Sequence, residues 1–245
     1  MSNFKYFNSL HLKIFAMVFM LCDHLWASLI PGNLWLTNIG RLAFPVFAFQ
    51  IVEGYRHTHD LNAYIKRLFF FALLSEIPFN LMYGGNIFFP FHQNVLFTFC
   101  IALLFLKWMD RMKKRGRFLF IVSVICSCIL GFFIGTVTMC DYFGYGVLMV
   151  FVFYLFDDSF YGWLGRIAAM IWINGYLMSG LTIPFTIFGH SFNFPQQAFA
   201  VFSLFFIFMY NGRPGRQDRM IRLLCYSFYP VHMLILALIW LFIVN

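Results

Sequence analysis

The chain has 245 residues, of which 62% are hydrophobic and only 11% are charged, and its mean hydropathy is +0.80. Soluble globular domains carry about 25% charged residues, so this composition excludes a soluble protein and indicates an integral membrane protein. The net charge of +8 does not indicate nucleic-acid binding, because the basic residues fall in short segments between apolar runs.

The apolar runs predict an all-α, polytopic membrane bundle that forms one domain over residues 1–245. A spanning helix needs about 20 apolar residues, so the length allows about nine spans, within a range of roughly eight to ten. The predicted helices are 11–31, 35–55, 61–83, 94–110, 117–139, 143–156, 160–179, 195–211 and 221–244. The stretch 179–195 is compatible with either a loop or a re-entrant segment. The first run has no small-residue cleavage site, so an uncleaved span is expected there.

The distribution of lysine and arginine predicts the orientation. Sixteen of the 17 basic residues lie at the N-terminus and in segments 55–67, 107–117, 157–166 and 211–222, while the alternate loops near 32, 85, 141 and 185 have none. The remaining one is Arg41. Cytoplasmic loops carry the excess of positive charge, so the N-terminus is expected in the cytoplasm and the protein in the cell membrane.

The cysteines give no sign of a metal site or of a disulfide framework. All lie in or at the ends of apolar runs, and none has the paired spacing of zinc ligands. They are interpreted as small buried hydrophobic residues, and no metal is expected. They are Cys22, Cys100, Cys126, Cys128, Cys140 and Cys225.

Polar residues from separate runs come to a similar depth, in the outer half of the membrane. An ionised side chain at the centre of a span costs about 2.5–3.5 kcal/mol, so Asp23, Arg41 and Glu76 are expected to face the bundle interior. Asp23 is expected to pair with Arg41. Neighbours on a helix point about 100° apart, so Asp23 is poorly placed to orient His24, which is expected to face a cavity.

Prolines strengthen this prediction of a shared polar chamber. Pro45 follows Arg41, Pro78 follows Glu76, and Pro230 precedes His232. Each proline removes one helical hydrogen bond, which at membrane depth is tolerated where the backbone lines a protein-enclosed or watery cavity.

Several segments together resemble a known family. They are LKIFAMVFMLCDHL, GRLAFPVFAFQIVEG, RLFFFALLSEIPFNLMY, NVLFTF, DYFGYGVLMV, QQAFAVFSL, YNGRPG and FYPVHMLIL. In this order they resemble the TraX family, whose named members include acetylases of conjugative pilin. The family is similar in outline to a wider group of membrane acyltransferases. The resemblance therefore implies that acetyl is taken from cytosolic acetyl-CoA and moved to an acceptor at the other membrane face.

The family's motifs fall on the polar residues singled out above. They match Asp23-His24, Gly40-Arg41 with Phe44-Pro45, Ser75-Glu76 with Pro78-Phe79, Tyr210-Asn211-Gly212, and Tyr229-Pro230 with His232. One departure is Pro214, which interrupts the family's more usual run of basic residue and glycine. The pilin-modifying members are distant from this chain, so the acceptor is not carried over. It is left as an amine-bearing peptide, a sugar or a small molecule, with N- and O-acetylation both open.

Acetyl transfer to an amine requires a base, a stabilised oxyanion and the exclusion of water. His24 is predicted to be the general base, because an imidazole has an unperturbed pKa near 6.5. His232 is the second candidate, as a partner base or as a donor to the thioester carbonyl, and a covalent acetyl-His intermediate stays open. Arg41 or Asn94 is expected to bind the oxyanion. Asp23 and Glu76 are expected to hold Arg41.

Two further groups of residues complete the prediction. The phosphates of acetyl-CoA are expected at a cytoplasmic basic cluster, because arginine and lysine bind phosphate by charge-assisted contacts. The candidates for this cluster are Arg213, Arg216, Arg219 and Arg222, or Lys113, Lys114 and Arg115. The residues expected on the substrate side are Asp141, Gln196, Tyr229 and His190.

Two other functions fit the same residue types. A proton-coupled transporter also uses intramembrane Asp, His, Arg and Glu together with kinked helices. Internal repeats would favour it, but the only echo is between Phe44-Pro45-Val46 and Tyr229-Pro230-Val231. A non-catalytic assembly factor is the third reading, and it predicts that His24 and His232 tolerate substitution.

Overall fold

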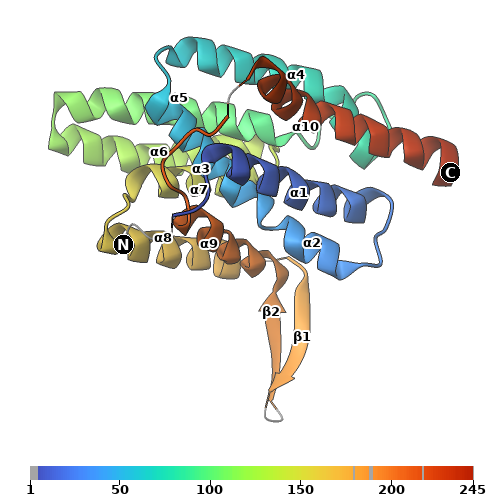
Figure 1. Cartoon of the computed structure of the whole chain (residues 1–245). Coiled ribbons are helices and arrows are strands. Elements are labelled where there is room, and N and C mark those ends of the chain that lie inside the picture. Colours follow the sequence, from blue (N-terminus) through green and yellow to red (C-terminus); the bar gives the residue numbers. More distant parts are fainter. Residues whose placement is uncertain (1–4, 179, 188–189, 217, 245) are drawn as a thin grey trace. The chain divides into compact units, whose positions relative to one another are not determined.

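The computed structural model describes residues 5–178, 180–187, 190–216 and 218–244, and most of them are helical (Figure 1). The α-helices are α1 (Ser9–Ser28), α2 (Leu34–Gly40), α3 (Ala43–His57), α4 (Leu61–Gly84), α5 (Val95–Arg115), α6 (Arg117–Val137), α7 (Phe143–Leu155), α8 (Phe160–Ile171), α9 (Ser203–Phe208) and α10 (Arg219–Ile239). A π-helical segment, Trp172–Leu177, continues α8, and another, Trp240–Val244, ends α10. A 3-10 segment, Gln196–Phe202, leads into α9.

Polar residues mark where several of these helices begin. A side-chain oxygen that accepts from the first free backbone amides stabilises a helix start. The caps are Asn8 to the His11 amide, Asp60 to the Ala63 amide, Asn94 to the Leu96 amide, and Ser159 to the Gly162 amide. Each lies beside an apolar run, so these helix starts could be read from the sequence.

The mostly helical fold is confirmed, with two corrections. The predicted span 35–55 is interrupted, because α2 ends at Gly40 and α3 begins at Ala43. Residues 179–195, expected as a loop or re-entrant piece, include an antiparallel hairpin of β1 (Thr182–Ile187) and β2 (His190–Pro195). Figure 1 shows this hairpin extending away from α2 and α9.

Four helical segments of the described chain are long and apolar enough to cross a membrane. They are Ser9–Ser28, Leu34–His57, Arg117–Val137 and Arg219–Phe242. Phe143–Leu155 and Gln196–Phe208 are apolar but shorter. The full set of nine spans and their orientation stay a prediction.

The helices group into two compact units. The first unit comprises the chain up to Gln50 and from Asp158 onward, and the second comprises Ile51–Asp157. The prediction of one domain over the whole chain stays a prediction.

In the first unit, α1 packs against α2 and α10, and the continuation of α8 packs against the 3-10 segment. The chain start is held to the loop before α10 by backbone hydrogen bonds, from the Phe7 amide to the Met209 carbonyl and from the Asn211 amide to the Phe7 carbonyl. These contacts place the N-terminal end of α1 beside the YNGRPG segment.

In the second unit, α5 packs against α4, α6 and α7. A stripe of small residues, every fourth along α6, is buried: Ser123, Ser127, Gly131 and Gly135. Small residues let helix backbones approach closely where apolar burial offers no driving force, as in a bilayer. The opposite face of α6 is apolar and exposed, with Phe118 at 76% and Phe133 at 63%, as expected for a lipid-facing helix.

Gly144, at the start of α7, is the point of closest approach to α6. A Cβ built on Gly144 would lie 2.2 Å from the Phe132 carbonyl oxygen and 2.6 Å from the Phe132 Cα. Backbone atoms cannot move aside as a flexible side chain can. We therefore expect Gly144→Ala to destabilise the protein by about 3 kcal/mol or more.

The measurement is thermal unfolding of the purified variant in detergent. Gly32→Ala is the matched control, because a Cβ there would meet no atom within 4 Å. Equal melting temperatures for the two variants would contradict the close approach of α6 and α7.

Candidate functional site

Two histidines from opposite ends of the chain meet in the first unit. His24 on α1 and His232 on α10 are 7% and 6% exposed, respectively. The Nδ1 of His24 lies 2.7 Å from the Nε2 of His232, and their ring centroids are 4.9 Å apart. The two imidazoles predicted as base and partner base are therefore in contact with one another, while the polar chamber around them stays a prediction.

The partners of His232 determine where the protons lie. Its Nδ1 is 2.6 Å from the Phe228 carbonyl oxygen. A carbonyl only accepts, so the Nδ1 of His232 carries the proton and its Nε2 accepts in the neutral ring. It follows that the Nδ1 of His24 donates, and the lone pair of neutral His24 lies on Nε2. This tautomer is assigned from the hydrogen-bond partners.

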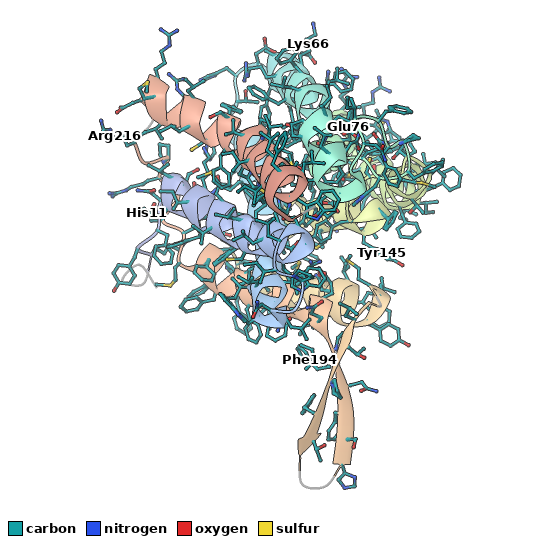
Figure 2. All side chains as sticks on the ribbon, turned by 90° about the vertical axis from the view of Figure 1, so that its right-hand side faces the viewer. His11, Lys66, Glu76, Tyr145, Phe194 and Arg216 are labelled. Carbon is teal, nitrogen blue, oxygen red and sulfur yellow. The ribbon has the colours of Figure 1, made fainter. Side chains whose placement is uncertain are left out.

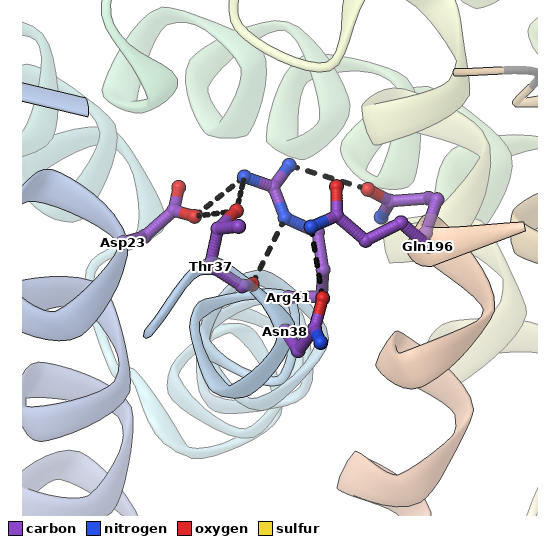
Figure 3. Close-up of polar contacts among 6 residues, drawn as sticks. Asp23, Thr37, Asn38, Arg41 and Gln196 are labelled. Carbon is purple, nitrogen blue, oxygen red and sulfur yellow. Dashed lines mark hydrogen bonds and ion pairs between the residues drawn. The ribbon is translucent and has the colours of Figure 1, made fainter. Parts of the chain in front are cut away.

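Asp23, the sequence neighbour of His24, forms the predicted ion pair with Arg41. The Nη2 of Arg41 lies 2.5 Å from the Oδ1 of Asp23 (Figure 3). Thr37 joins both, because its hydroxyl donates to Asp23 over 2.8 Å and accepts from Arg41 over 2.9 Å. The interruption between α2 and α3 puts Arg41 at the end of α2, one turn after Thr37. The pairing expected from the sequence is confirmed.

Gly40 makes room for this ion pair. A Cβ at Gly40 would lie 2.4 Å from the Cβ and 2.6 Å from the Oδ1 of Asp23. Any larger residue would push α2 away from α1 at the position where Asp23 reaches Arg41. In the Gly40-Arg41 motif, the glycine is therefore explained by the close approach of Asp23, and the arginine by its ion pair with Asp23.

A line of amides continues from Arg41 into the interior of the first unit. Arg41 Nη1 donates to Gln197 Oε1 over 3.3 Å, Gln197 Nε2 donates to Asn174 Oδ1 over 3.0 Å, and Asn174 Nδ2 donates to the Met170 carbonyl over 3.0 Å. Asn174 is fully buried and lies in the π-helical continuation of α8. Wide turns of this type occur often at functional sites.

Gln196 and Tyr229, expected on the substrate side, also lie in this unit. Gln196 Nε2 donates to Asn38 Oδ1 over 2.8 Å (Figure 3). The Tyr229 ring centroid lies 6.5 Å from that of His24 and 6.1 Å from that of His232. The third such residue, His190, is exposed at the start of β2.

Sequence reasoning missed several polar residues of this unit. No sequence motif includes Thr37, Asn38 or Asn174. The π-helical turn that contains Asn174 has no sequence signature either. Arg166, counted among the charges of a loop segment, is a fully buried residue of α8. Its Nη1 lies 2.7 Å from the Oδ1 of Asp158. Its isolated position in an apolar run could have indicated that Arg166 is buried and paired.

The remaining predicted catalytic residues, Glu76 and Asn94, pair with one another in the second unit. Asn94 Nδ2 lies 2.5 Å from the Oε2 of Glu76 and 2.8 Å from the Ala72 carbonyl oxygen. Asn94 also caps α5 through its side-chain oxygen. The expected contact of Glu76 with Arg41 would join the two units, and it stays a prediction.

Asp141 lies in a strained turn of the second unit. Met139, Tyr142 and Phe143 have positive φ angles of 51°, 62° and 48°. Non-glycine residues in this region are uncommon, and such strain persists only where surrounding contacts hold it. Here Thr98 donates to the Asp141 carbonyl over 2.7 Å, and the Asp141 amide donates to the Gln93 carbonyl over 2.8 Å.

His92, in the loop between α4 and α5, faces Asp141, with His92 Nε2 3.4 Å from Asp141 Oδ1. Partial burial alone would lower the pKa of His92. The hydrogen bond and negative charge of Asp141, together with the charge of Glu76, outweigh it and raise this pKa above its ordinary value of 6.5. Protonated His92 is therefore stabilised in the folded protein.

A pH dependence follows from this shift. A histidine whose pKa is higher in the folded state than in the unfolded state adds to the free energy of unfolding. This contribution is complete at pH values below the unfolded pKa, near 6.5, and is lost as the pH rises through the folded pKa. We expect His92→Gln to melt roughly 2 °C below the native protein at about pH 6, with the gap closing at higher pH. A gap that stayed constant with pH would instead assign the loss to ring packing against Phe79 and Tyr83.

The two basic groups proposed for phosphate binding lie in different units. Lys113, Lys114 and Arg115 are exposed in the last turn of α5, where cations interact favourably with the helix dipole. The other group is exposed around the start of α10, in the unit that contains the histidine pair: Arg213, Arg216, Arg219 and Arg222. Cations at a helix N-terminus are unfavourable with the helix dipole. An anion bound there would be stabilised both by the arginine charges and by the positive end of the dipole.

Within the described residues, no group of three or more His, Cys, Asp or Glu side chains is placed to hold a metal ion. All six cysteines are free thiols.

Comparison with known proteins gives one family. A model of this family, described as TraX protein, matches residues 9–240. The chain is 32% identical over 109 residues to a probable fimbrial assembly protein FimC, serogroup H1, of Dichelobacter nodosus, and 34% identical over 103 residues to the protein TraX of Escherichia coli K12. Each alignment covers 40% of this chain, and 45% and 39% of the two relatives, respectively. No solved structure matches.

Proposed function

This chain belongs to the TraX family, and on that basis we propose that it is a membrane-embedded acetyltransferase. It takes acetyl from cytosolic acetyl-CoA and transfers it to an amine acceptor that enters from the outer side. The observation that carries the proposal is the buried His24–His232 pair, with its 2.7 Å contact between ring nitrogens. Buried imidazoles with defined tautomers are groups that can accept and release protons.

The chemical step needs a proton to leave the acceptor. His24 Nε2 takes a proton from the ammonium form of the acceptor, and the neutral amine then attacks the thioester carbonyl. The tetrahedral intermediate collapses and the carbon–sulfur bond breaks. The amine nitrogen loses its second proton as the amide forms, and the departing coenzyme A thiolate takes up this proton, so coenzyme A leaves as the free thiol. His232 Nε2 accepts the hydrogen bond of His24 Nδ1 and stabilises the imidazolium. His232 is therefore a positioning residue for His24.

Arg41 is the better candidate for the oxyanion. The Asn94 amide already donates to Glu76 and to the Ala72 carbonyl. Arg41 belongs to the same unit as the histidine pair, and its guanidinium is held in place by Asp23, Thr37 and Gln197. Donors whose positions are fixed in advance stabilise a developing charge without reorganisation.

Coenzyme A is proposed to bind at the start of α10. Arg219 and His232 lie on the same helix, 13 positions apart. At 1.5 Å per residue this is about 20 Å along the helix axis. The phosphates can therefore stay at the basic cytoplasmic end while the long pantetheine arm extends toward the histidines. Because they share a helix with His232, the α10 arginines are favoured over Lys113, Lys114 and Arg115.

The test uses the purified protein in detergent or in vesicles. With labelled acetyl-CoA and an amine acceptor, we expect time-dependent transfer of label to the amine and release of free thiol. Protein without acceptor is the control for hydrolysis of the thioester. Absence of transfer, together with pH-driven uptake of a solute into vesicles, would overturn the proposal in favour of a proton-coupled transporter.

A further inference from the structure

Helix α4 carries polar atoms that are buried and have no hydrogen-bond partner among the described residues. They are Ser75 Oγ, Glu76 Oε1 and Asn80 Oδ1. Ser75 is fully buried and Asn80 is 2% exposed. Buried polar atoms in folded proteins are almost always hydrogen-bonded, so three such atoms within six residues of one helix call for an explanation.

Glu76 and Asn80 lie on the same face of α4. Residues at positions i, i+4 and i+7 lie on one face of a helix, and here they are Glu76, Asn80 and Tyr83. Asn80 therefore follows Glu76 by about one helical turn on this face. Figure 2 shows Glu76 part-way along α4, with Lys66 nearer the start of the helix.

The nearby side-chain amide donors are already used, which leaves two acceptor oxygens and the Ser75 hydroxyl, a group that can donate or accept. The Asn94 amide donates to Glu76 Oε2 and to the Ala72 carbonyl, and the Asn80 amide donates to the Ile87 carbonyl over 3.3 Å. His92 directs its ring nitrogen at Asp141. What remains is one carboxylate oxygen, one amide carbonyl oxygen and one hydroxyl.

Aromatic rings lie on the same helix and in the loop after it. The Phe79 ring centroid is 4.8 Å from that of Tyr83 and 4.9 Å from that of His92. A carboxylate, a carbonyl acceptor and aromatic faces together are the chemistry that recognises a primary ammonium, which has a positive charge and three N–H donors.

We propose that Glu76 and Asn80 bind the protonated primary amine of the acceptor, before it is deprotonated. This inference deepens the proposed acetyl transfer and rests on it. Glu76 supplies the charge, Asn80 supplies a further acceptor, and Phe79 and Tyr83 contact the carbon atoms next to the nitrogen.

The test measures binding without acetyl-CoA. The full chain in detergent is titrated with n-butylammonium chloride, and saturation-transfer NMR reports the ligand affinity. The neutral isostere 1-butanol and sodium chloride are the comparison ligands. We expect n-butylammonium to bind roughly tenfold or more tightly than 1-butanol, because a charged hydrogen bond to the carboxylate is lost with the alcohol.

Four variants make the test specific. Glu76→Gln keeps the shape and removes the charge, and we expect it to weaken n-butylammonium binding about tenfold. Asn80→Leu removes an acceptor and should also weaken it, whereas Asn80→Asp adds a second charge and should tighten it. Asn86→Leu is the matched control, because Asn86 is exposed in the turn after the same helix. Circular dichroism and gel filtration confirm that each variant is folded.

The outcomes separate this site from the proposed reaction. Equal binding of n-butylammonium and 1-butanol, competition by sodium at equal concentration, or unchanged affinity in Glu76→Gln and Asn80→Asp would overturn the ammonium site, whatever the transferase assay gives. Binding that follows the four variants, in a protein that transfers no acetyl, would overturn the proposed function and with it the acceptor role of this site.

Discussion

Replacing His24 with alanine is expected to lower the rate of acetyl transfer by on the order of 10²–10⁴-fold, the usual contribution of a positioned general base. The effect should fall on kcat, because His24 acts on a proton and not on the affinity for acetyl-CoA. The measurement is the initial rate of label transfer at saturating acetyl-CoA, with purified protein whose folding is checked by gel filtration.

The controls use the other histidines. His59→Ala removes an exposed imidazole of the second unit and should leave the rate unchanged. His232→Leu removes the acceptor for the Nδ1 proton of His24 and should give a loss smaller than that of His24→Ala. Because the two rings act as one unit, the double variant should be no worse than His24→Ala alone. Transfer at the native rate in His24→Ala would remove His24 from the reaction.

Breaking the Asp23–Arg41 ion pair from one side is expected to have the largest effect on stability. The two side chains are only 15% and 21% exposed, so removing one leaves a charge that is mostly buried. We expect Arg41→Met to lose about 3–5 kcal/mol of stability, the range measured when one partner of a buried pair is removed. Asp23→Leu should lose a similar amount.

The double variant and an exposed ion pair provide the controls. With both charges gone, Asp23→Leu combined with Arg41→Met should recover most of the loss, because no unpaired charge is left in an apolar interior. Arg216→Ala breaks a pair whose side chains are 74% and 46% exposed, and it should change stability by less than about 1 kcal/mol. Melting temperatures in detergent would decide the matter. An Arg41→Met variant as stable as Arg216→Ala would contradict a buried ion pair.

Much of the helix pattern was predictable because each long apolar run needs its backbone hydrogen bonds satisfied within the segment. The helices predicted at 61–83, 117–139 and 143–156 end within two residues of α4, α6 and α7. The hairpin at 182–195 was not predicted. Its short aromatic and β-branched segments fit a strand as well as an apolar loop, and periodicity does not separate such cases.

The site divides in the same way. An unpaired charge within an apolar run has a high free-energy cost, so the pairing of Asp23 with Arg41 could be inferred from the sequence alone. The steric role of Gly40 could not, because it depends on the distance between α1 and α2. The amide line through Gln197 and Asn174 was also invisible, since a π-helical turn leaves no pattern in the sequence.

The sequence by itself determined that the chain is an apolar helical protein of the TraX family, with titratable groups placed in segments that favour a low-dielectric interior. Composition and periodicity are local properties of the amino-acid sequence, so they can be determined without coordinates. Only the tertiary structure decided which groups touch. It joined His24 to His232 across 208 positions of chain, and it gave Glu76 the partner Asn94. Hydrogen bonds depend on distances of a fraction of an ångström, and those distances follow from helix packing that no single segment specifies.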